Sequence, residues 1–258
     1  MKIAVCVSGQ LRKLDKNLIS DAFKDHDVDY YVHTWEHDLN PNYNKIRKYF
    51  TNVTYSVEKY GNEDTFDNIV NDQLDNNRYL YAQFYTVYKS IRMALASKKK
   101  YDLYVRTRTD VIWPMDNWTT DGFDKLNLEI KDTIANAINE PREDFDFRNS
   151  TLPVVAIGIS GIYHNKLVLR DWSWGMNTAA ATLLATDTSV REFMVNAKDT
   201  RKMLSRHADY PRAHSPVVWG DIFTQKKILI QVSSMFNSRL LRYSQNDQNF
   251  IDGYGDIS

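Results

Sequence analysis

The feature that most constrains the fold is a pair of uninterrupted apolar segments separated by a helical pattern. Residues 2–8 read KIAVCVS and residues 28–35 read VDYYVHTW, and neither segment alternates between apolar and polar side chains. A strand that is apolar at successive positions is buried on both faces, which is typical of a parallel sheet covered by helices. A helical pattern over residues 15–23 lies between them, and residues 52–58 are expected to form a third strand. The sequence therefore predicts an α/β fold with a mixed, mostly parallel central sheet flanked by helices.

The rest of the chain continues this alternation of strands and helices. Phe84, Val87 and Ile91 recur at helical spacing, whereas residues 116–150 are mixed and polar. No repeat or linker interrupts the chain, so we expect one domain, 1–258, with an N-terminal half up to residue 113 and a more variable half from 114. Further helices are expected over 79–97, 165–185, 189–205 and 216–227, and further strands over 101–106, 152–161 and 228–232.

Composition excludes several classes of protein. The 258 residues carry a formal net charge of +0, which gives no global attraction to nucleic acid or to an anionic membrane. Cys6 is the only cysteine, so neither an internal disulfide nor a cysteine-based zinc site is expected, and its apolar surroundings indicate a buried core residue. The first apolar run stops at Gly9, too early for a signal sequence, and no segment is long enough to span a membrane. We expect a cytoplasmic protein.

Polar side chains follow the first two predicted strands. Ligands bind beyond the carboxyl ends of the strands in sheets of this kind. Gly9 permits close approach of a ligand to the backbone, and Ser8 and Arg12 offer donors suited to a phosphate or a ribose. The end of the second strand could line a base or ribose pocket, or hold a histidine that the backbone satisfies. The candidate binding residues are Ser8, Gly9, Gln10, Arg12, His33, Thr34 and Trp35.

The segment YVRTRTDVIW, residues 104–113, carries the strongest signal. If the strand continues through it, Arg106 and Arg108 share one face and repel each other unless an anion lies between them. A diphosphate would satisfy both guanidinium groups, and Asp110 could hold a divalent cation that bridges the diphosphate oxygens. The alternative is an arginine–aspartate network that ties the strand end to a helix.

A late helix, within HSPVVWGDIF at residues 214–223, carries two further candidates. Asp221 has apolar neighbours, and a carboxylate in such company could act as general base toward a hydroxyl group. His214 precedes the helix and is a candidate metal ligand. The alternatives are a solvent-facing aspartate and a structural histidine.

Taken in order, these segments resemble a GT-A-fold glycosyltransferase, most closely the bacterial and viral family related to WavE-type lipopolysaccharide-synthesis enzymes. The likeness rests on KIAVCVSGQLR, DVDYYVHTW, AQFYTVYKSIRMA and YDLYVRTRTDV, covers residues 1–113, and returns faintly at SPVVWGDIFTQKKILIQV. The resemblance implies a Rossmann-type, GT-A-like sheet and a nucleotide-sugar donor bound by the N-terminal half. It implies a Mn²⁺ or Mg²⁺ ion at Asp110, the second aspartate of the Asp-x-Asp metal motif. The first position of that motif is occupied by Arg108.

The sequence therefore predicts an enzyme that transfers a sugar from a nucleotide-diphosphate sugar to an acceptor hydroxyl. In this mechanism Arg108 and Asp110 act at the diphosphate and Asp221 is the base. The acceptor would be a glycan or a hydroxymethylated base in phage DNA, because the Asn- and Tyr-rich composition suits a phage or an AT-rich bacterium. The alternatives are a nucleotidyltransferase and a non-catalytic module that binds sugar or nucleic acid.

Overall fold

The computed structural model describes most of the chain. The described residues are 1–11, 18–59, 78–113, 118–138, 145–158, 160–163, 166–169, 173–186, 215–236 and 238–240. Among them, no helix has the length and apolar character needed to cross a bilayer.

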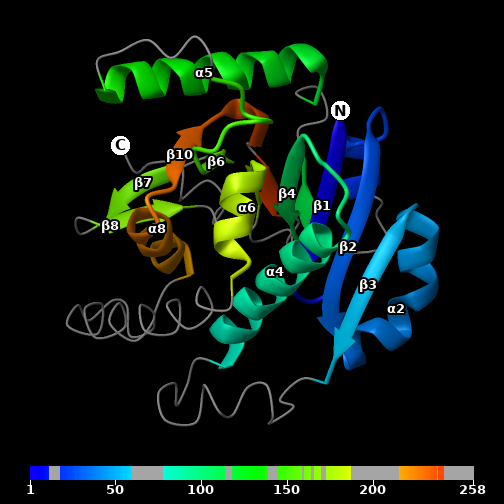
Figure 1. The fold of residues 1–258 in the computed structure, drawn as a ribbon. Helices are drawn as coiled ribbons and strands as arrows, with labels where there is room; N and C mark the ends of the chain where they lie inside the picture. The colour runs from blue at the N-terminus through cyan, green and yellow to red at the C-terminus, as the bar shows by residue number, and fades with distance from the viewer. Residues whose placement is uncertain are drawn as a thin grey trace.

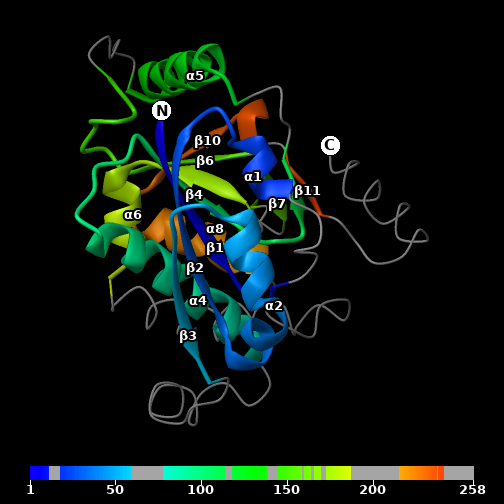
Figure 2. The ribbon, with the colours of Figure 1, turned by 90° about the vertical axis from the view of Figure 1, so that its right-hand side faces the viewer.

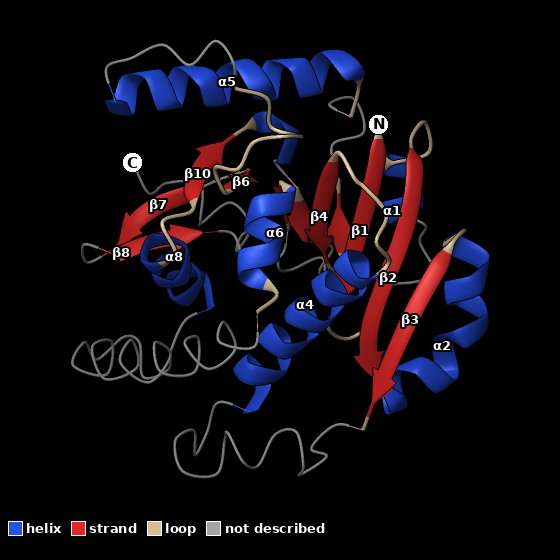
Figure 3. Cartoon of the chain, viewed as in Figure 1, coloured by secondary structure: helices blue, strands red, loops and turns tan. Residues whose placement is uncertain are grey.

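A seven-stranded sheet forms the centre of the molecule (Figures 1 and 3). Its strand order is β10-β6-β9-β4-β1-β2-β3. Neighbouring strands run parallel except β9, which is antiparallel to both β4 and β6. The α/β fold with a mostly parallel sheet is thus confirmed. The strands are β1 (Lys2–Ser8), β2 (Asp27–Trp35), β3 (Val53–Glu58), β4 (Leu103–Thr107), β6 (Val154–Ile157), β9 (Trp174–Met176) and β10 (Leu229–Val232).

Helices cover both faces of this sheet, with α4 and α6 on one side and α1 and α2 on the other (Figure 2). Buried side chains of α4, α6 and α8 share one core cluster with Ala4 and Cys6, whereas those of α1, α2 and α5 share a second with Ile3 and Val5. Successive residues of β1 therefore enter opposite cores, as the apolar runs predicted. The helices are α1 (Leu18–Ala22), α2 (Glu36–Tyr49), α4 (Arg78–Ala96), α5 (Thr120–Ile138), α6 (Thr178–Leu184) and α8 (Ser215–Gln225).

Two small antiparallel ladders complete the described structure. β5 (Val111–Ile112) pairs with β11 (Arg239–Leu240), and β7 (Ser160–Tyr163) pairs with β8 (Lys166–Leu169). A 3-10 turn, η2 (Ser234–Phe236), joins the second core cluster.

The helix expected over residues 165–185 is wrong. This segment forms β8, β9 and only then α6. Gly175, at the centre of β9, allows a close approach: a Cβ there would lie 2.2 Å from Cζ of Phe236, a ring that is itself buried. Because Gly175 has no side chain, the Phe236 ring packs directly on β9, the strand that lies between β4 and β6 in the sheet. The helix expected over 189–205 lies outside the described residues.

Two long helices were missed or underestimated. α5 spans 19 residues of the segment that reads as mixed and polar, and it buries Phe123, Leu126, Ile130 and Ile134. α2 contains Pro41. Ile46 is fully buried in the second core cluster, and Leu39 and Tyr49 pack against the same cluster while partly buried. Three widely spaced apolar contacts on a polar helix leave only a weak periodic signal in the sequence.

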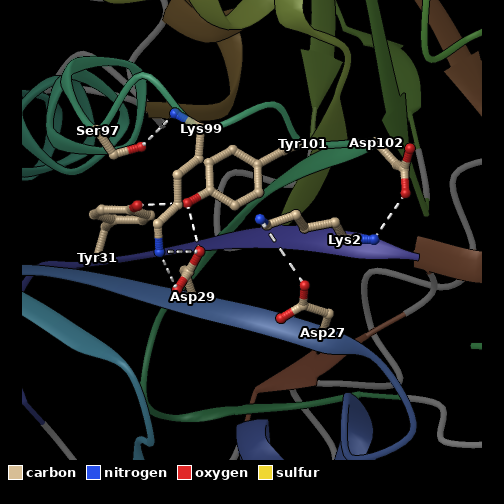
Figure 4. A network of polar contacts seen from close by, with 8 residues as sticks. All are labelled: Lys2, Asp27, Asp29, Tyr31, Ser97, Lys99, Tyr101 and Asp102. Atoms are coloured by element: carbon tan, nitrogen blue, oxygen red, sulfur yellow. Dashed lines mark hydrogen bonds and ion pairs between the residues drawn. The ribbon is translucent and has the colours of Figure 1, made fainter.

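A network of polar contacts lies at the edge of the sheet where the parallel strands begin (Figure 4). The buried Asp29 accepts hydrogen bonds from Lys99 Nζ, at 2.9 Å to each carboxylate oxygen, and from the Tyr101 hydroxyl at 2.7 Å. The Tyr101 oxygen lies 2.5 Å from that of Tyr31, which donates to it because the Tyr101 proton is already directed at Asp29. Beside it, the backbone N–H of Lys2 donates to Asp102 Oδ2 at 2.7 Å. We call Asp29, Tyr31, Lys99 and Tyr101 the amino-edge network.

Candidate active site

The opposite edge of the sheet gathers the predicted site residues. β1, β2 and β4 are adjacent and parallel, so their carboxyl ends lie side by side. Ser8 is in register with His33, and Cys6 with Arg106. Because side chains alternate along a strand, Ser8, His33 and Arg106 project to the face that α4 covers. The structure thus places three predicted site residues on one face of one sheet edge.

The polar side-chain atoms of His33 and Ser8 are buried there without a hydrogen-bond partner among the described residues. His33 is fully buried, and neither ring nitrogen has a hydrogen-bond partner among the described residues. The Ser8 hydroxyl is equally without one. Burial lowers the pKa of His33 to about 4; the charge of Glu58 opposes this effect and that of Lys89 adds to it. The imidazole is therefore neutral at neutral pH, and it offers one donor and one acceptor.

Aromatic rings and one carboxylate surround His33. Trp35 and Tyr85 both meet its ring edge to face, and they stack on each other with an interplanar angle of 15°. The Tyr85 hydroxyl donates to Glu58 at 2.7 Å, and Lys89 lies 2.8 Å from the other Glu58 oxygen. Glu58 ends β3, so it satisfies the same rule that selected His33, and sequence reasoning missed it. Tyr85 gave no signal beyond the periodicity of its helix.

Arg106 is a fully buried cation. Its guanidinium carbon lies 4.8 Å from the ring centroid of Trp174, in the neighbouring strand β9. Trp174 in turn contacts Trp219 of α8 edge to face at 4.8 Å, and Trp219 stacks on Phe84 of α4 at 4.1 Å. An aromatic wall thus holds one positive charge beside the strand end. The contact between Trp174 and Arg106 was not predicted, because a helix was expected where β9 lies.

Arg108 and Asp110 follow the end of the strand and pair with each other. β4 ends at Thr107, so the expected strand alternation of the two arginines stops before Arg108. Arg108 Nε donates to Asp110 Oδ1 at 2.9 Å, and Nη2 donates to Oδ2 at 2.7 Å. Two parallel bonds of this kind form the strongest arginine–carboxylate geometry. The predicted arginine–aspartate pairing is present, although it joins residues of one loop.

Two backbone contacts fix the position of this loop. The Thr109 hydroxyl donates to the Gln10 carbonyl at 3.3 Å, which ties the segment after β4 to the segment after β1. Thr107 Oγ1 donates to the Arg108 carbonyl at 3.1 Å and accepts from the indole N–H of Trp113 at 3.1 Å. The Ser8-Gly9-Gln10 and Arg106–Asp110 segments are therefore neighbours, as predicted.

Gly9 has the backbone conformation that its prediction required. Its φ is +94°, a region that side chains disfavour, and no atom lies within 4 Å of a Cβ built there. A residue with a side chain would strain the turn that follows β1. Arg12 lies outside the described residues.

Thr34 is not brought together with His33 and Trp35. It is fully buried on the other face of the sheet, and its hydroxyl has no hydrogen-bond partner among the described residues. The expected row of His33, Thr34 and Trp35 is thus divided by the alternation of the strand.

Asp221 lies on α8, which the aromatic wall brings to this edge of the sheet. It is partly buried, and at 100° per residue it projects from nearly the opposite side of the helix to Trp219. Its role as general base stays a prediction. His214 lies outside the described residues.

The donor set at Asp110 does not fit a divalent cation. Both carboxylate oxygens already accept from Arg108, so a cation there would lie against a guanidinium charge. In the described part of the chain, no three His, Cys, Asp or Glu side chains cluster closely enough to hold a metal ion. The metal site at Asp110 and His214 stays a prediction.

Comparisons with known proteins add little to this geometry. No protein-family model and no curated protein matches the chain. Among solved structures, the apo form of mouse xyloside xylosyltransferase 1 aligns with 90% of this chain and 83% of its own, at 9% identity and a TM-score of 0.38. A likeness at that TM-score carries no argument about fold or activity.

Proposed function

We propose that this protein is a glycosyltransferase that takes its sugar from a nucleotide-diphosphate donor bound at the carboxyl edge of the sheet. The observation that carries the proposal is the position of two buried polar side chains, Ser8 and His33, near two arginines, Arg106 and Arg108, toward the ends of adjacent parallel strands. Neither Ser8 nor His33 has a side-chain hydrogen-bond partner in the described part of the chain. Unsatisfied buried donors and acceptors suit a polar ligand, and the guanidinium groups suit phosphate. The sequence resemblance to WavE-type GT-A enzymes supports the same assignment.

The residues have distinct roles in the proposed reaction. The acceptor hydroxyl attacks the anomeric carbon, while the bond from that carbon to the β-phosphate oxygen breaks. The electron pair leaves with the diphosphate, whose growing negative charge is stabilised by Arg106 and Arg108. The Asp221 carboxylate takes the hydroxyl proton if the anomeric configuration inverts. Each step uses groups that the chain itself supplies.

Donor binding is the direct test. Isothermal titration with a panel of UDP-, GDP- and dTDP-sugars should find at least one that binds. Arg108→Gln should weaken its binding about 10- to 100-fold, because it removes a charge-assisted hydrogen bond. Arg47→Gln is the matched control, since it removes the same charge from the exposed surface of α2, beside Tyr43. Binding of oligosaccharide or DNA without any nucleotide sugar would contradict the proposal, and binding of nucleoside triphosphates alone would favour a nucleotidyltransferase.

The acceptor is proposed to be a glycan or hydroxymethylated DNA. Mass spectrometry after incubation of the donor with each acceptor distinguishes them, because only the true acceptor gains the mass of one sugar residue.

A further inference from the structure

We infer that Arg108, held in place by Asp110, supplies the positive charge that a divalent cation would supply at the diphosphate, so that donor binding needs no metal ion. The inference rests on the proposed function, because it concerns how the same site holds the donor. It makes Arg108 the phosphate-binding group and Asp110 a positioning residue.

The geometry of the pair carries the first step. Both Asp110 oxygens are engaged, at 2.9 and 2.7 Å, by Nε and Nη2 of one guanidinium. The Asp110 side chain is 8% exposed and that of Arg108 is 25% exposed. The carboxylate is thus the covered partner and the arginine the accessible one. The remaining N–H groups of the guanidinium point away from Asp110, where they can donate to phosphate oxygens.

The surroundings of the pair carry the second step. The backbone at Arg108 is fixed by the Thr107 hydroxyl, and the next residue is fixed by the bond from Thr109 to Gln10. With its backbone and its guanidinium both held, Arg108 has little freedom left to lose when a ligand binds. The fully buried Arg106 lies two residues earlier, within β4, so a second guanidinium precedes the loop and adds positive charge at this end of the strand.

The charge balance carries the third step. A divalent cation bound to Asp110 would displace Arg108 or lie against it, and among the described residues Asp110 belongs to no cluster of three or more His, Cys, Asp or Glu side chains that could hold such an ion. A diphosphate meets no such conflict, because it is attracted to the same guanidinium that Asp110 orients. The position where the related enzymes carry the first metal-binding aspartate therefore holds the replacement for the metal.

Titration of UDP, GDP, dTDP and ADP in excess EDTA, and again in excess Mn²⁺, tests this inference. We expect the best-binding nucleotide to have the same affinity in both buffers, within about threefold. Arg108→Gln should weaken it about 10- to 100-fold in both, and Arg108→Lys should recover only part of the loss, because lysine keeps the charge without the planar fork.

A double-mutant cycle separates positioning from metal binding. Asp110→Asn should weaken binding about 3- to 10-fold in EDTA when Arg108 is present, because it loosens the guanidinium. In the Arg108→Gln background it should have no further effect. If Asp110 only positions Arg108, its substitution matters only when Arg108 is present. If Asp110 binds the metal, its substitution should abolish the effect of Mn²⁺ on nucleotide affinity whether or not Arg108 is present.

The outcomes distinguish the inference from the proposed function. Binding that EDTA abolishes and Mn²⁺ restores would overturn the inference and leave the proposed function standing. If none of these nucleotides and none of the corresponding nucleotide sugars binds in either buffer, both the inference and the proposed function fail. Should a variant not fold, as judged by circular dichroism, the comparison of the two buffers with the unaltered protein decides alone.

Discussion

The two edges of the central sheet treat buried polar groups in opposite ways. At the amino edge, Asp29 is covered by Lys99 and Tyr101, and Tyr101 is covered by Tyr31. At the carboxyl edge, the Ser8 hydroxyl and both ring nitrogens of His33 are buried with no partner in the described structure. One strand, β2, carries both arrangements, with Asp29 and Tyr31 near its start and His33 near its end, so the difference does not come from the kind of secondary structure.

The difference separates groups that stabilise the fold from groups that do not. A satisfied buried hydrogen bond contributes about 1 kcal/mol, whereas a buried group left without one destabilises the fold by about 1–3 kcal/mol. The amino-edge network therefore contributes stability, and the carboxyl edge loses it. Local loss of stability of this kind is characteristic of functional sites, where catalysis, a bound ion or an ordered water accounts for the unsatisfied group.

The largest expected effect is a pH dependence of stability that belongs to the carboxyl edge. Burial lowers the pKa of His33 from 6.5 to about 4, so the unfolded chain binds a proton that the folded protein does not. Stability is then full above pH 6.5 and falls as the pH drops toward 4, by about 1.4 kcal/mol per pH unit and about 3 kcal/mol in total. Urea unfolding at a series of pH values measures this slope.

His33→Leu is the control for that slope. It removes the titrating group and one buried, unsatisfied side chain, so we expect equal or greater stability at pH 7 and a flatter profile between pH 6.5 and 4. Donor affinity should fall in the same variant. Parallel pH profiles for the two proteins would show that His33 is not the group responsible.

The amino edge should respond only at lower pH and to a different substitution. Burial alone would raise the pKa of Asp29, but hydrogen bonds from Lys99 and Tyr101 outweigh it, and the net pKa lies below the ordinary value. Its contribution is thus present above that ordinary value, near pH 4, and is lost only as the pH falls further. Asp29→Ala should destabilise the protein by about 2 kcal/mol at pH 7, as measured by urea unfolding, with donor affinity unchanged.

Asp27→Ala is the matched control on the same strand. Its carboxylate is 66% exposed and lies 4.0 Å from Lys2, so its removal should leave stability unchanged. Equal losses in the two variants, or a loss of donor affinity in Asp29→Ala, would contradict the division between the edges.

The features that could be predicted from the sequence are those set by residues close together in the chain. The uninterrupted apolar run of β1 gave the parallel sheet, and the rule that ligands bind at carboxyl ends selected Ser8, His33 and Arg106 correctly as neighbours. Those predictions need only local periodicity and one topological rule.

The features that were missed depend on contacts between distant segments. β9 reads as part of a helix in the sequence, but in the structure it is a strand on which Phe236, 61 residues after Gly175, packs directly. The contact of Arg106 with Trp174 follows from that strand and could not be expected without it. The Asp29–Lys99 pair spans 70 residues and had no signal at all.

The smallest expected effect is a difference in stability between two Thr→Val variants, which tests the contribution of hydrogen bonding at two buried threonines. Thr34 and Thr107 are both fully buried near the carboxyl ends of their strands, but only Thr107 is satisfied, by the Trp113 indole and the Arg108 carbonyl. Thr107→Val should destabilise the protein by about 1–2 kcal/mol, because it leaves the buried indole N–H without an acceptor. Thr34→Val removes a buried hydroxyl that has no hydrogen-bond partner in the described structure, and it should stabilise the protein by up to about 1 kcal/mol. Urea unfolding of the two variants tests the sign: losses of equal size would mean that a partner for Thr34 exists and that this edge is as well satisfied as the other.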